Sequence, residues 1–249
     1  MEVIYSKNKL IPIKKSILTV GSYDGIHRGH RELLSALVKN SKDIGIPSIV
    51  VTFDPHPREI LNESLNNFLL IMNLEQKLKI IETCGIDIVY VINFTEHFSK
   101  ITANDFMHQI VIPFLNPKII IIGANHYFGK GREGSPSYLN NFGKKNHIEI
   151  IIIQPILNNS EEISSTRIRE FITSGFIQKA NCELGTKFSI HGEVVHGSER
   201  GRKLNFPTAN INLLDKRQLL PKIGVYLIHG RSNGLNAFGM CNLGVRPTF

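Results

Sequence analysis

The sequence lacks tryptophan and has only three cysteines in 249 residues. Cys84, Cys182 and Cys241 are odd in number and far apart, which fits neither a disulfide framework nor a zinc-ligand pair. No apolar run approaches the roughly 20 residues that a membrane-spanning helix needs. Residues 1–16 contain no uninterrupted apolar stretch of the kind found in signal peptides. We therefore expect a cytoplasmic protein with no membrane partner.

The chain also lacks an acidic or basic tail, because its charged residues, 20% of the total, are spread along it. Lysine and arginine exceed aspartate and glutamate by 29 to 21, which gives a formal net charge of +8. This excess favours anionic partners, and nucleotides, phosphorylated metabolites and nucleic acid all remain open. The hydrophobic content of 42% is enough for a buried core.

Residues 17–153 alternate short β-branched runs with stretches of helical periodicity, a pattern typical of a parallel sheet covered by helices. Capping signals predict a helix over 106–115 after Thr102, a second after Ser135 and Pro136, and a third opened by Ser164 or Ser165. The third stops near Gly175, and a further helix covers 176–184. The expected strands are 17–21, 47–53, 86–92, 118–122 and 148–153.

After Gly185 the pattern changes to short alternating strands separated by glycine and proline turns. We expect strands over 187–196, 208–212, 224–230 and 236–243, which form the start of a small all-β unit. The predicted domains are therefore an α/β domain over 1–184 and a β domain over 185–249.

The strongest motif follows the first expected strand, where residues 21–30 read GSYDGIHRGH. Ligands of open α/β sheets bind at such a place, because the next helix directs free N–H groups toward them. Gly21 and Gly25 allow the backbone to approach phosphate. His27 and His30 are three positions apart, so both imidazoles can face one phosphate group, which suits stabilisation of an α-phosphate during adenylyl transfer. An ordinary turn or a partial metal site are the alternatives, although no third ligand is evident.

A second cluster, SSTRIR at 164–169, opens a helix. Hydroxyls and N–H groups at a helix start hold anions, and Arg167 or Arg169 can neutralise a pyrophosphate leaving group. Taken alone, the cluster is also compatible with an ordinary helix cap and solvent-facing arginines. Because it stands downstream of the first motif, we predict a second phosphate clamp.

Four motifs in order resemble those of the bacterial bifunctional riboflavin kinase/FMN adenylyltransferase family, also called FAD synthetase. They are GSYDGIHRGH at 21–30, TFDPHP at 52–57, GANHYFGKGR at 123–132 and SSTRIR at 164–169. The resemblance implies a Rossmann-like nucleotidyltransferase domain followed by a β-barrel domain. It implies that ATP, FMN and riboflavin are the small-molecule substrates, that Mg²⁺ assists, and that AMP passes from ATP to FMN to give FAD.

The site residues expected from the motifs and the resemblance form three groups. The catalytic residues are His27, His30 and Arg167. The ATP-binding residues are Gly21, Ser22, Tyr23, Asp24, Gly25, Ser164, Ser165, Thr166 and Arg167, and the flavin-binding residues are Phe53, Asp54, Pro55, His56, Pro57, Asn125 and Phe128. From the residues alone, the two prolines stiffen a loop and an aromatic ring beside glycines can stack on a flat ligand, but Phe53 and Phe128 can equally be core residues and Asn125 a turn former.

The second half resembles the kinase part of the family through residues 196–210, HGSERGRKLNFPTAN. There the resemblance implies that Thr208 and Asn210 hold Mg²⁺ and ATP phosphates, as a hard cation with oxygen ligands requires. Two other functions remain open. One is a related nucleotidyltransferase acting on a phosphorylated sugar alcohol or pantetheine, and the other is a nucleotide- or RNA-binding module that uses the same basic surface without catalysis. For the enzyme we expect no specific nucleic-acid partner.

We expect this chain not to phosphorylate riboflavin. Phosphoryl transfer to a hydroxyl usually needs a carboxylate that orients the acceptor, and the family's catalytic glutamate is expected beyond Phe249, with the strands that complete the barrel. Chromatography of riboflavin incubated with ATP, Mg²⁺ and the protein should show riboflavin unchanged. FMN produced at an enzymatic rate would contradict this expectation.

Overall fold

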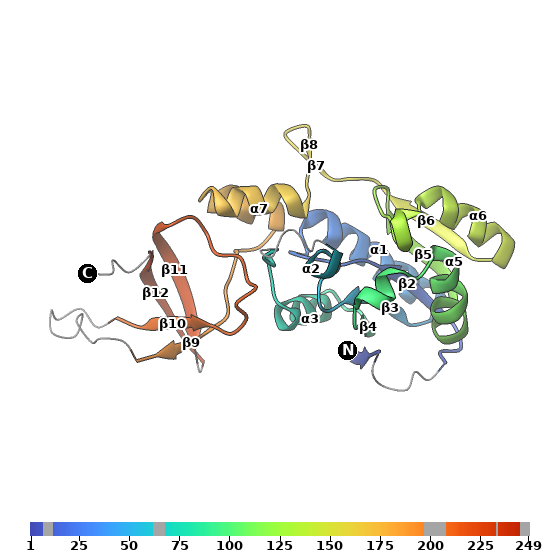
Figure 1. Ribbon diagram of the computed structural model, residues 1–249, viewed down its shortest axis with the longest axis horizontal. Helices are drawn as coiled ribbons and strands as arrows, with labels where there is room; N and C mark the ends of the chain where they lie inside the picture. Colours follow the sequence, from blue (N-terminus) through green and yellow to red (C-terminus); the bar gives the residue numbers. More distant parts are fainter. Residues whose placement is uncertain (7–11, 62–67, 197–207, 233, 245–249) are drawn as a thin grey trace.

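The computed structural model describes residues 1–6, 12–61, 68–196, 208–232 and 234–244. Its first half is built on a six-stranded sheet in which every neighbouring pair is parallel. The strand order is β1-β4-β3-β2-β5-β6 (Figure 1). The strands are β1 (Glu2–Tyr5), β2 (Ser16–Val20), β3 (Ser48–Phe53), β4 (Ile88–Ile92), β5 (Pro117–Gly123) and β6 (Glu149–Ile153).

The predicted parallel sheet is confirmed, and the five expected strands are present with ends shifted by at most two residues. Strand β1 was missed. It has only four residues, is partly exposed and lies at the edge of the sheet against β4. Because an edge strand is covered less completely, its sequence lacks the continuous apolar run by which the inner strands are found.

Helices cover both faces of the sheet because successive strand residues point to opposite sides. Ile17, Val50 and Val89 pack with helices α1 (Arg28–Ile44) and α3 (Leu74–Thr83). Leu18, Ile49 and Ile120 face the other side and pack with α5 (Ala103–Phe106), η1 (Met107–Leu115) and α6 (Pro136–Asn146). The result is a three-layer α/β domain.

The helix expected over 106–115 is only partly correct. Thr102 caps the observed α5, and its hydroxyl accepts a hydrogen bond from the Asp105 amide at 3.0 Å. Residues 107–115 then form a π-helix that contains Pro113. Proline has no amide hydrogen to donate to the preceding turn, which accounts for the departure from regular α-helix. The predicted Ser135 cap and the Pro136 start of α6 are confirmed.

Helices α7 (Ser165–Thr173) and α8 (Ile177–Leu184) close the first half. Ser164 is the N-cap of α7, which decides between the two serines proposed for this role. The remaining short elements are α2 (Pro57–Leu61), α4 (Glu96–Ser99), the 3₁₀ turn η2 (Lys130–Arg132), β7 (Leu157–Asn158) and β8 (Glu161–Glu162).

The second half contains two antiparallel strand pairs (Figure 1). Strand β9 (Gly192–Val195) pairs with β10 (Asn210–Leu213), and β11 (Gly224–Ser232) forms a hairpin with β12 (Leu235–Leu243). The predicted change to short antiparallel strands is confirmed. The predicted first strand, 187–196, is too long, since only 192–195 are in a strand.

The second half returns to touch the first through residues 215–219. The Leu70 amide donates to the Arg217 carbonyl at 2.7 Å, and the Leu219 amide donates to the Leu70 carbonyl at 2.7 Å. Leu219 is buried in the cluster that contains Ile71 and Ile168. The boundary predicted near 184–186 therefore separates two patterns of secondary structure whose residues share one apolar cluster.

Candidate functional site

The candidate site lies where the chain order of the sheet reverses. Strand β2 sits between β3 and β5, and the chain continues from β2 toward one edge of the sheet before returning to β5 beside it. Loops at the carboxyl ends of such strands diverge and leave a crevice for ligands. We name residues 21–27 the β2 loop and residues 54–57 the β3 loop. Both loops leave the sheet at the carboxyl ends of their strands.

The two predicted histidines lie together at the start of α1. His27 is the N-cap, and its Nδ1 accepts a hydrogen bond from the His30 amide at 3.4 Å. The two rings are stacked, with centroids 3.7 Å apart and planes inclined by 19°. Because Nδ1 of His27 is an acceptor, the proton of its neutral imidazole resides on Nε2. Two imidazole rings therefore lie side by side at the amino end of α1.

Both histidines are neutral at pH 7. Burial lowers the pKa of His27 to about 4. The pKa of His30 lies well below its ordinary value, mainly through burial, with the protonated form of His27 and the charge of Lys77 lowering it further. His30 Nδ1 is buried and has no hydrogen-bond partner among the described residues. A neutral imidazole can still donate one hydrogen bond, so the pair can bind an anion without first paying for protonation.

The side chains of Tyr23 and Asp24 point into the protein. The Tyr23 hydroxyl lies 2.6 Å from Thr19 Oγ1, and burial raises the pKa of Tyr23. Asp24 accepts a hydrogen bond from the Ile71 amide at 3.0 Å and pairs with the Arg169 guanidinium. These two predicted ATP-binding residues hold the β2 loop in place through their side chains.

The rest of the β2 loop offers backbone and small side chains. Gly21, Ser22 and Gly25 have no bulky group, and Gly25 has a φ of 91°, which strongly favours glycine. A Cβ atom there would lie 3.1 Å from the Ile71 side chain. Their contact with ATP stays a prediction.

The second predicted phosphate clamp lies beside the first. Ser165 Oγ donates to the Asp24 carbonyl at 2.7 Å, and Arg169 Nε donates to the Leu69 carbonyl at 3.1 Å. Ser164 caps α7 by accepting from the Arg167 amide, while Thr166 is exposed. Two motifs that are 141 positions apart are thus in direct contact, and the amino ends of α1 and α7 meet the same loop.

Arg167 is held by carboxylates in this structure. Its Nε lies 2.9 Å from Glu183 Oε1, and its guanidinium also pairs with Glu161. The same group lies over the Phe171 ring, 5.2 Å from the centroid. Its predicted action on pyrophosphate stays a prediction and requires the exposed Glu161 to give way to a phosphate.

The β3 loop is packed by aromatic rings. Phe53 makes an edge contact with Phe94 at 5.5 Å between centroids, and His56 stacks on Phe68 at 4.6 Å. The Asp54-Pro55 peptide bond is cis, and Pro57 begins α2. Burial, with nearby Lys77, Arg169 and Arg58 adding to it, lowers the pKa of His56 to about 3. The ring of His56 is therefore a neutral, buried support of the loop.

Asn125 and Phe128 follow β5. Asn125 is exposed, and its Nδ2 donates to both carboxylate oxygens of Glu162 at 2.8 and 3.0 Å. Phe128 packs on Phe106 and Tyr138, with centroid distances of 5.6 and 6.1 Å. Part of the Phe128 ring therefore belongs to the core, which is one of the two roles that the sequence analysis considered for it. Flavin contact by either residue stays a prediction.

Two models of known protein families match the sequence of this chain. A sequence model of FAD synthetase matches residues 11–167, and one of riboflavin kinase matches residues 184–249. The bifunctional riboflavin kinase/FMN adenylyltransferase of Buchnera aphidicola subsp. Schizaphis graminum is 38% identical over 94% of this chain and 75% of its own length. That of Escherichia coli strain K12 is 35% identical over 95% and 75%. This chain belongs to that family.

The likeness extends to a solved structure. A crystal structure described as a macrolide-efflux protein from Streptococcus pneumoniae matches 100% of this chain and 81% of that chain, with a TM-score of 0.89 and 31% identity. No helix in the described part of this chain is both long and apolar enough to cross a membrane. The two matching family models and the two relatives named above confirm the predicted resemblance to the bifunctional family.

The kinase half of this family member presents two oxygen donors near the start of β10. Thr208 and Asn210 are both exposed. A hydroxyl and an amide oxygen are hard ligands of the kind that Mg²⁺ accepts, so these two residues would hold the ion beside the phosphates of ATP, and this role stays a prediction. Residues 197–207, the rest of the predicted kinase turn, lie outside the described residues. The described residues contain no group of three or more His, Cys, Asp or Glu placed to hold a metal.

Sequence reasoning missed two cations beside the β3 loop. Arg217, from the second half, lies 3.1 Å from Glu59 Oε2, 2.7 Å from Asp215 Oδ2 and 3.9 Å from Asp54 Oδ1. The other is Lys77, which is 5% exposed. Its position gave a signal, because Lys77 precedes the buried Ile81 by four residues on one face of α3. Nothing in the sequence pointed to Arg217, because Glu59 and Asp54, its partners at the β3 loop, are more than 150 positions away.

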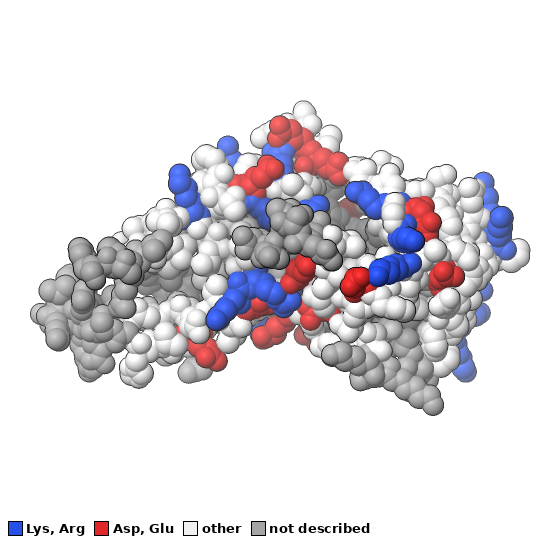
Figure 2. Space-filling model, in the orientation of Figure 1, with Lys and Arg blue, Asp and Glu red and all other residues white. Residues whose placement is uncertain are grey.

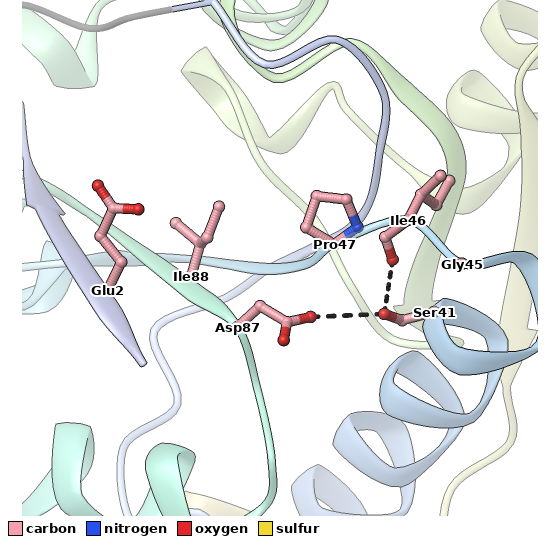
Figure 3. A pocket seen from close by; sticks show the side chains of 7 residues that line it. All are labelled: Glu2, Ser41, Gly45, Ile46, Pro47, Asp87 and Ile88. Atoms are coloured by element: carbon pink, nitrogen blue, oxygen red, sulfur yellow. Dashed lines mark hydrogen bonds between the residues drawn. The ribbon is translucent and has the colours of Figure 1, made fainter.

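The structure also has a hollow of about 470 Å³ near the amino ends of strands β1, β3 and β4 (Figure 3). Ser41, Pro47 and Asp87 line it. Ser41 Oγ donates to the Ile46 carbonyl at 2.6 Å, and Asp87 accepts from the Ser48 amide and hydroxyl. The side chains of Ser41 and Asp87 already have hydrogen-bond partners, whereas a buried imidazole nitrogen at the crevice has none among the described residues, so the crevice is the better candidate.

We predict that His126→Phe will reduce the loss of stability in acid. His126 stacks on Phe128, its Nε2 is buried, and burial lowers its pKa from 6.5 to about 4. Between these values the unfolded state binds more protons, so stability falls as pH falls. Replacing the imidazole should shrink the drop in unfolding free energy between pH 7 and pH 5 by about 2 kcal/mol, measured by denaturant titration. The exposed His108→Phe is the control, and equal drops in both variants would contradict the assignment.

Proposed function

We propose that this protein makes FAD by transferring AMP from ATP to FMN, with release of pyrophosphate. The observation that carries the proposal is the meeting of the two predicted phosphate motifs. Ser165 donates to the Asp24 carbonyl, which brings the start of α7 against the loop that leads to the stacked histidines of α1. Membership of the family supplies the flavin as the acceptor.

In this reaction an oxygen of the FMN phosphate attacks the α-phosphorus of ATP. A new P–O bond forms, the bond between the α-phosphorus and the bridging oxygen breaks, and that oxygen leaves with pyrophosphate. Negative charge builds on the α-phosphate oxygens in the transition state. His27 and His30 are placed to donate hydrogen bonds to these oxygens, and the amino end of α1 adds its partial positive charge. No covalent intermediate on the protein is needed.

The start of α7 is proposed to hold the β- and γ-phosphates. Ser164, Ser165 and Thr166 provide hydroxyls and amides there, and Arg167 lies in the first turn of the helix. Mg²⁺ bound to the triphosphate would neutralise charge on the leaving pyrophosphate. The protein's own contribution is to align the acceptor and the leaving group on opposite sides of the α-phosphorus.

Two alternatives have less support. A nucleotidyltransferase for another phosphorylated acceptor would not explain why residues 184–249 match riboflavin kinase. An RNA-binding module would be expected to gather its excess of basic residues on one surface. On the face shown in Figure 2, lysine and arginine side chains instead lie next to acidic ones across the middle of the molecule. The cytoplasmic location and the domain boundary remain predictions.

We predict that FMN, ATP and Mg²⁺ incubated with the protein will give FAD and an equal amount of pyrophosphate. Chromatography of the flavins, coupled to a pyrophosphate assay, measures both products. A well-folded sample that forms no FAD over a range of pH and metal would refute the proposed function.

We further predict that His30→Ala will lower turnover on the order of 100-fold, as loss of one preorganised donor does in other enzymes. The unfolding midpoint should change far less, because the imidazole's role is in the transition state. His108→Ala, which removes an exposed imidazole, is the control and should leave turnover unchanged. Wild-type turnover in His30→Ala would remove this residue from the mechanism.

A further inference from the structure

Lys77 is a buried cation that the mechanism above does not use. Its side chain extends from α3 and is 5% exposed. Nζ lies 3.4 Å from Thr52 Oγ1 and 3.5 Å from the Phe53 carbonyl, both near the limit of a hydrogen bond. No carboxylate oxygen of the described residues lies within ion-pair distance of Nζ, although five other lysines and arginines in the described part of the chain have one. A buried ammonium without a contacting counter-ion is costly.

The nearest acidic groups are committed elsewhere. Asp24, Asp54 and Glu59 favour the charged form of Lys77, while burial is the larger effect and lowers the pKa of Lys77. Asp24 is already paired with Arg169 and two backbone amides. Glu59 accepts from the His56 amide and from Arg217. The ammonium therefore retains unused capacity to donate hydrogen bonds.

The place of this ammonium is set by rigid elements. Helix α3 opens with a reciprocal cap between Asn73 and Gln76, one residue before Lys77. Thr52 and Phe53, the groups nearest to Nζ, are the last residues of β3. Thr52 Oγ1 also donates to the Ser22 carbonyl at 3.3 Å. Lys77 thus lies between the β2 loop and the β3 loop, at the carboxyl edge of the sheet.

We propose that Lys77 binds the 5′-phosphate of FMN and presents its attacking oxygen to the α-phosphate of ATP. This inference rests on the proposed function. A phosphate monoester is a dianion at neutral pH, and its oxygens would supply the counter-charge that the described carboxylates do not. The position of Lys77 favours the acceptor over ATP, because it lies beneath the β3 loop.

The test is the variant Lys77→Met, which keeps the length of the side chain and removes its charge. The KM for FMN should rise at least about tenfold, as expected for loss of a charge-assisted hydrogen bond, while the KM for ATP should change little. Lys79→Met is the matched control. Lys79 lies two residues along the same helix, is exposed and pairs only with Glu75 at 3.7 Å, so its replacement should leave both constants unchanged.

Riboflavin distinguishes a role in phosphate binding from a purely structural role, which would weaken the binding of FMN and riboflavin alike. It has the same ring system and no phosphate, so its inhibition constant against FMN should be the same in the parent protein and in Lys77→Met. A parallel loss of FMN and riboflavin binding would overturn the proposal, because it would mean that the flavin pocket had collapsed. An increase in the KM for ATP alone would overturn it as well.

If Lys77→Met does not fold, a crystal structure of the unmodified protein with FMN decides the question. The FMN phosphate should lie within hydrogen-bond distance of Lys77 Nζ, and a phosphate bound away from it would overturn the proposal. Failure here is distinct from failure of the proposed function. A parent protein that forms FAD, with a Lys77→Met variant that keeps the parent KM for FMN, refutes only the role of Lys77.

Discussion

The buried carboxylate of Asp24 is the interaction on which the site depends. It accepts hydrogen bonds from the amides of Ile71 and Met72 and pairs with Arg169. The carbonyl of the same residue accepts from Ser165. One residue therefore joins the β2 loop, the segment before α3 and the start of α7. Removing one partner of such a buried pair typically costs 3–5 kcal/mol in proteins, about a third or more of the stability of a small domain.

This arrangement explains why the groups proposed to bind phosphate are mostly neutral. Arg169 is used to hold Asp24, and Arg167 is paired with Glu183 and Glu161. What remains to meet phosphate is the two imidazoles, the hydroxyls of the α7 start, and backbone amides at two helix ends. Such groups are fixed before the substrate arrives, so little reorganisation is required when charge develops. Lys77 is the exception, a buried charge that we propose meets the phosphate of the acceptor.

Much of this could be predicted from the sequence, because local patterns carried it. The inner strands have continuous apolar runs, and the caps at Thr102, Ser135 and Ser164 have their usual residue types. The nearness of His27 and His30 follows from helical spacing alone. The sequence predicted that the motifs at 21–30 and 164–169 both bind phosphate, but their direct contact over 141 positions leaves no local pattern.

Other features depend on tertiary contacts that leave little local trace. The inward turn of Asp24 is decided by Ile71 and Arg169, and an Asp-Gly pair reads equally well as an exposed turn. The π-helix at Met107–Leu115 and the edge strand β1 lack the regular periodicity on which recognition depends. Arg217 reaches the β3 loop from a segment that lies between the predicted strands 208–212 and 224–230 and carries no predicted motif. Which parts of Phe128 face the core and which face a ligand is likewise a matter of packing.

The central claim is that one crevice transfers the adenylyl group of ATP to FMN. Position-labelled ATP tests it most directly, because the reaction divides the nucleotide between its α- and β-phosphorus atoms. With phosphorus-32 in the α position, the label should appear in the flavin product and co-migrate with FAD. With the label in the γ position, it should appear only in pyrophosphate. Label from the γ position on the flavin, or α-label released as ADP or AMP with the flavin unlabelled, would contradict the account.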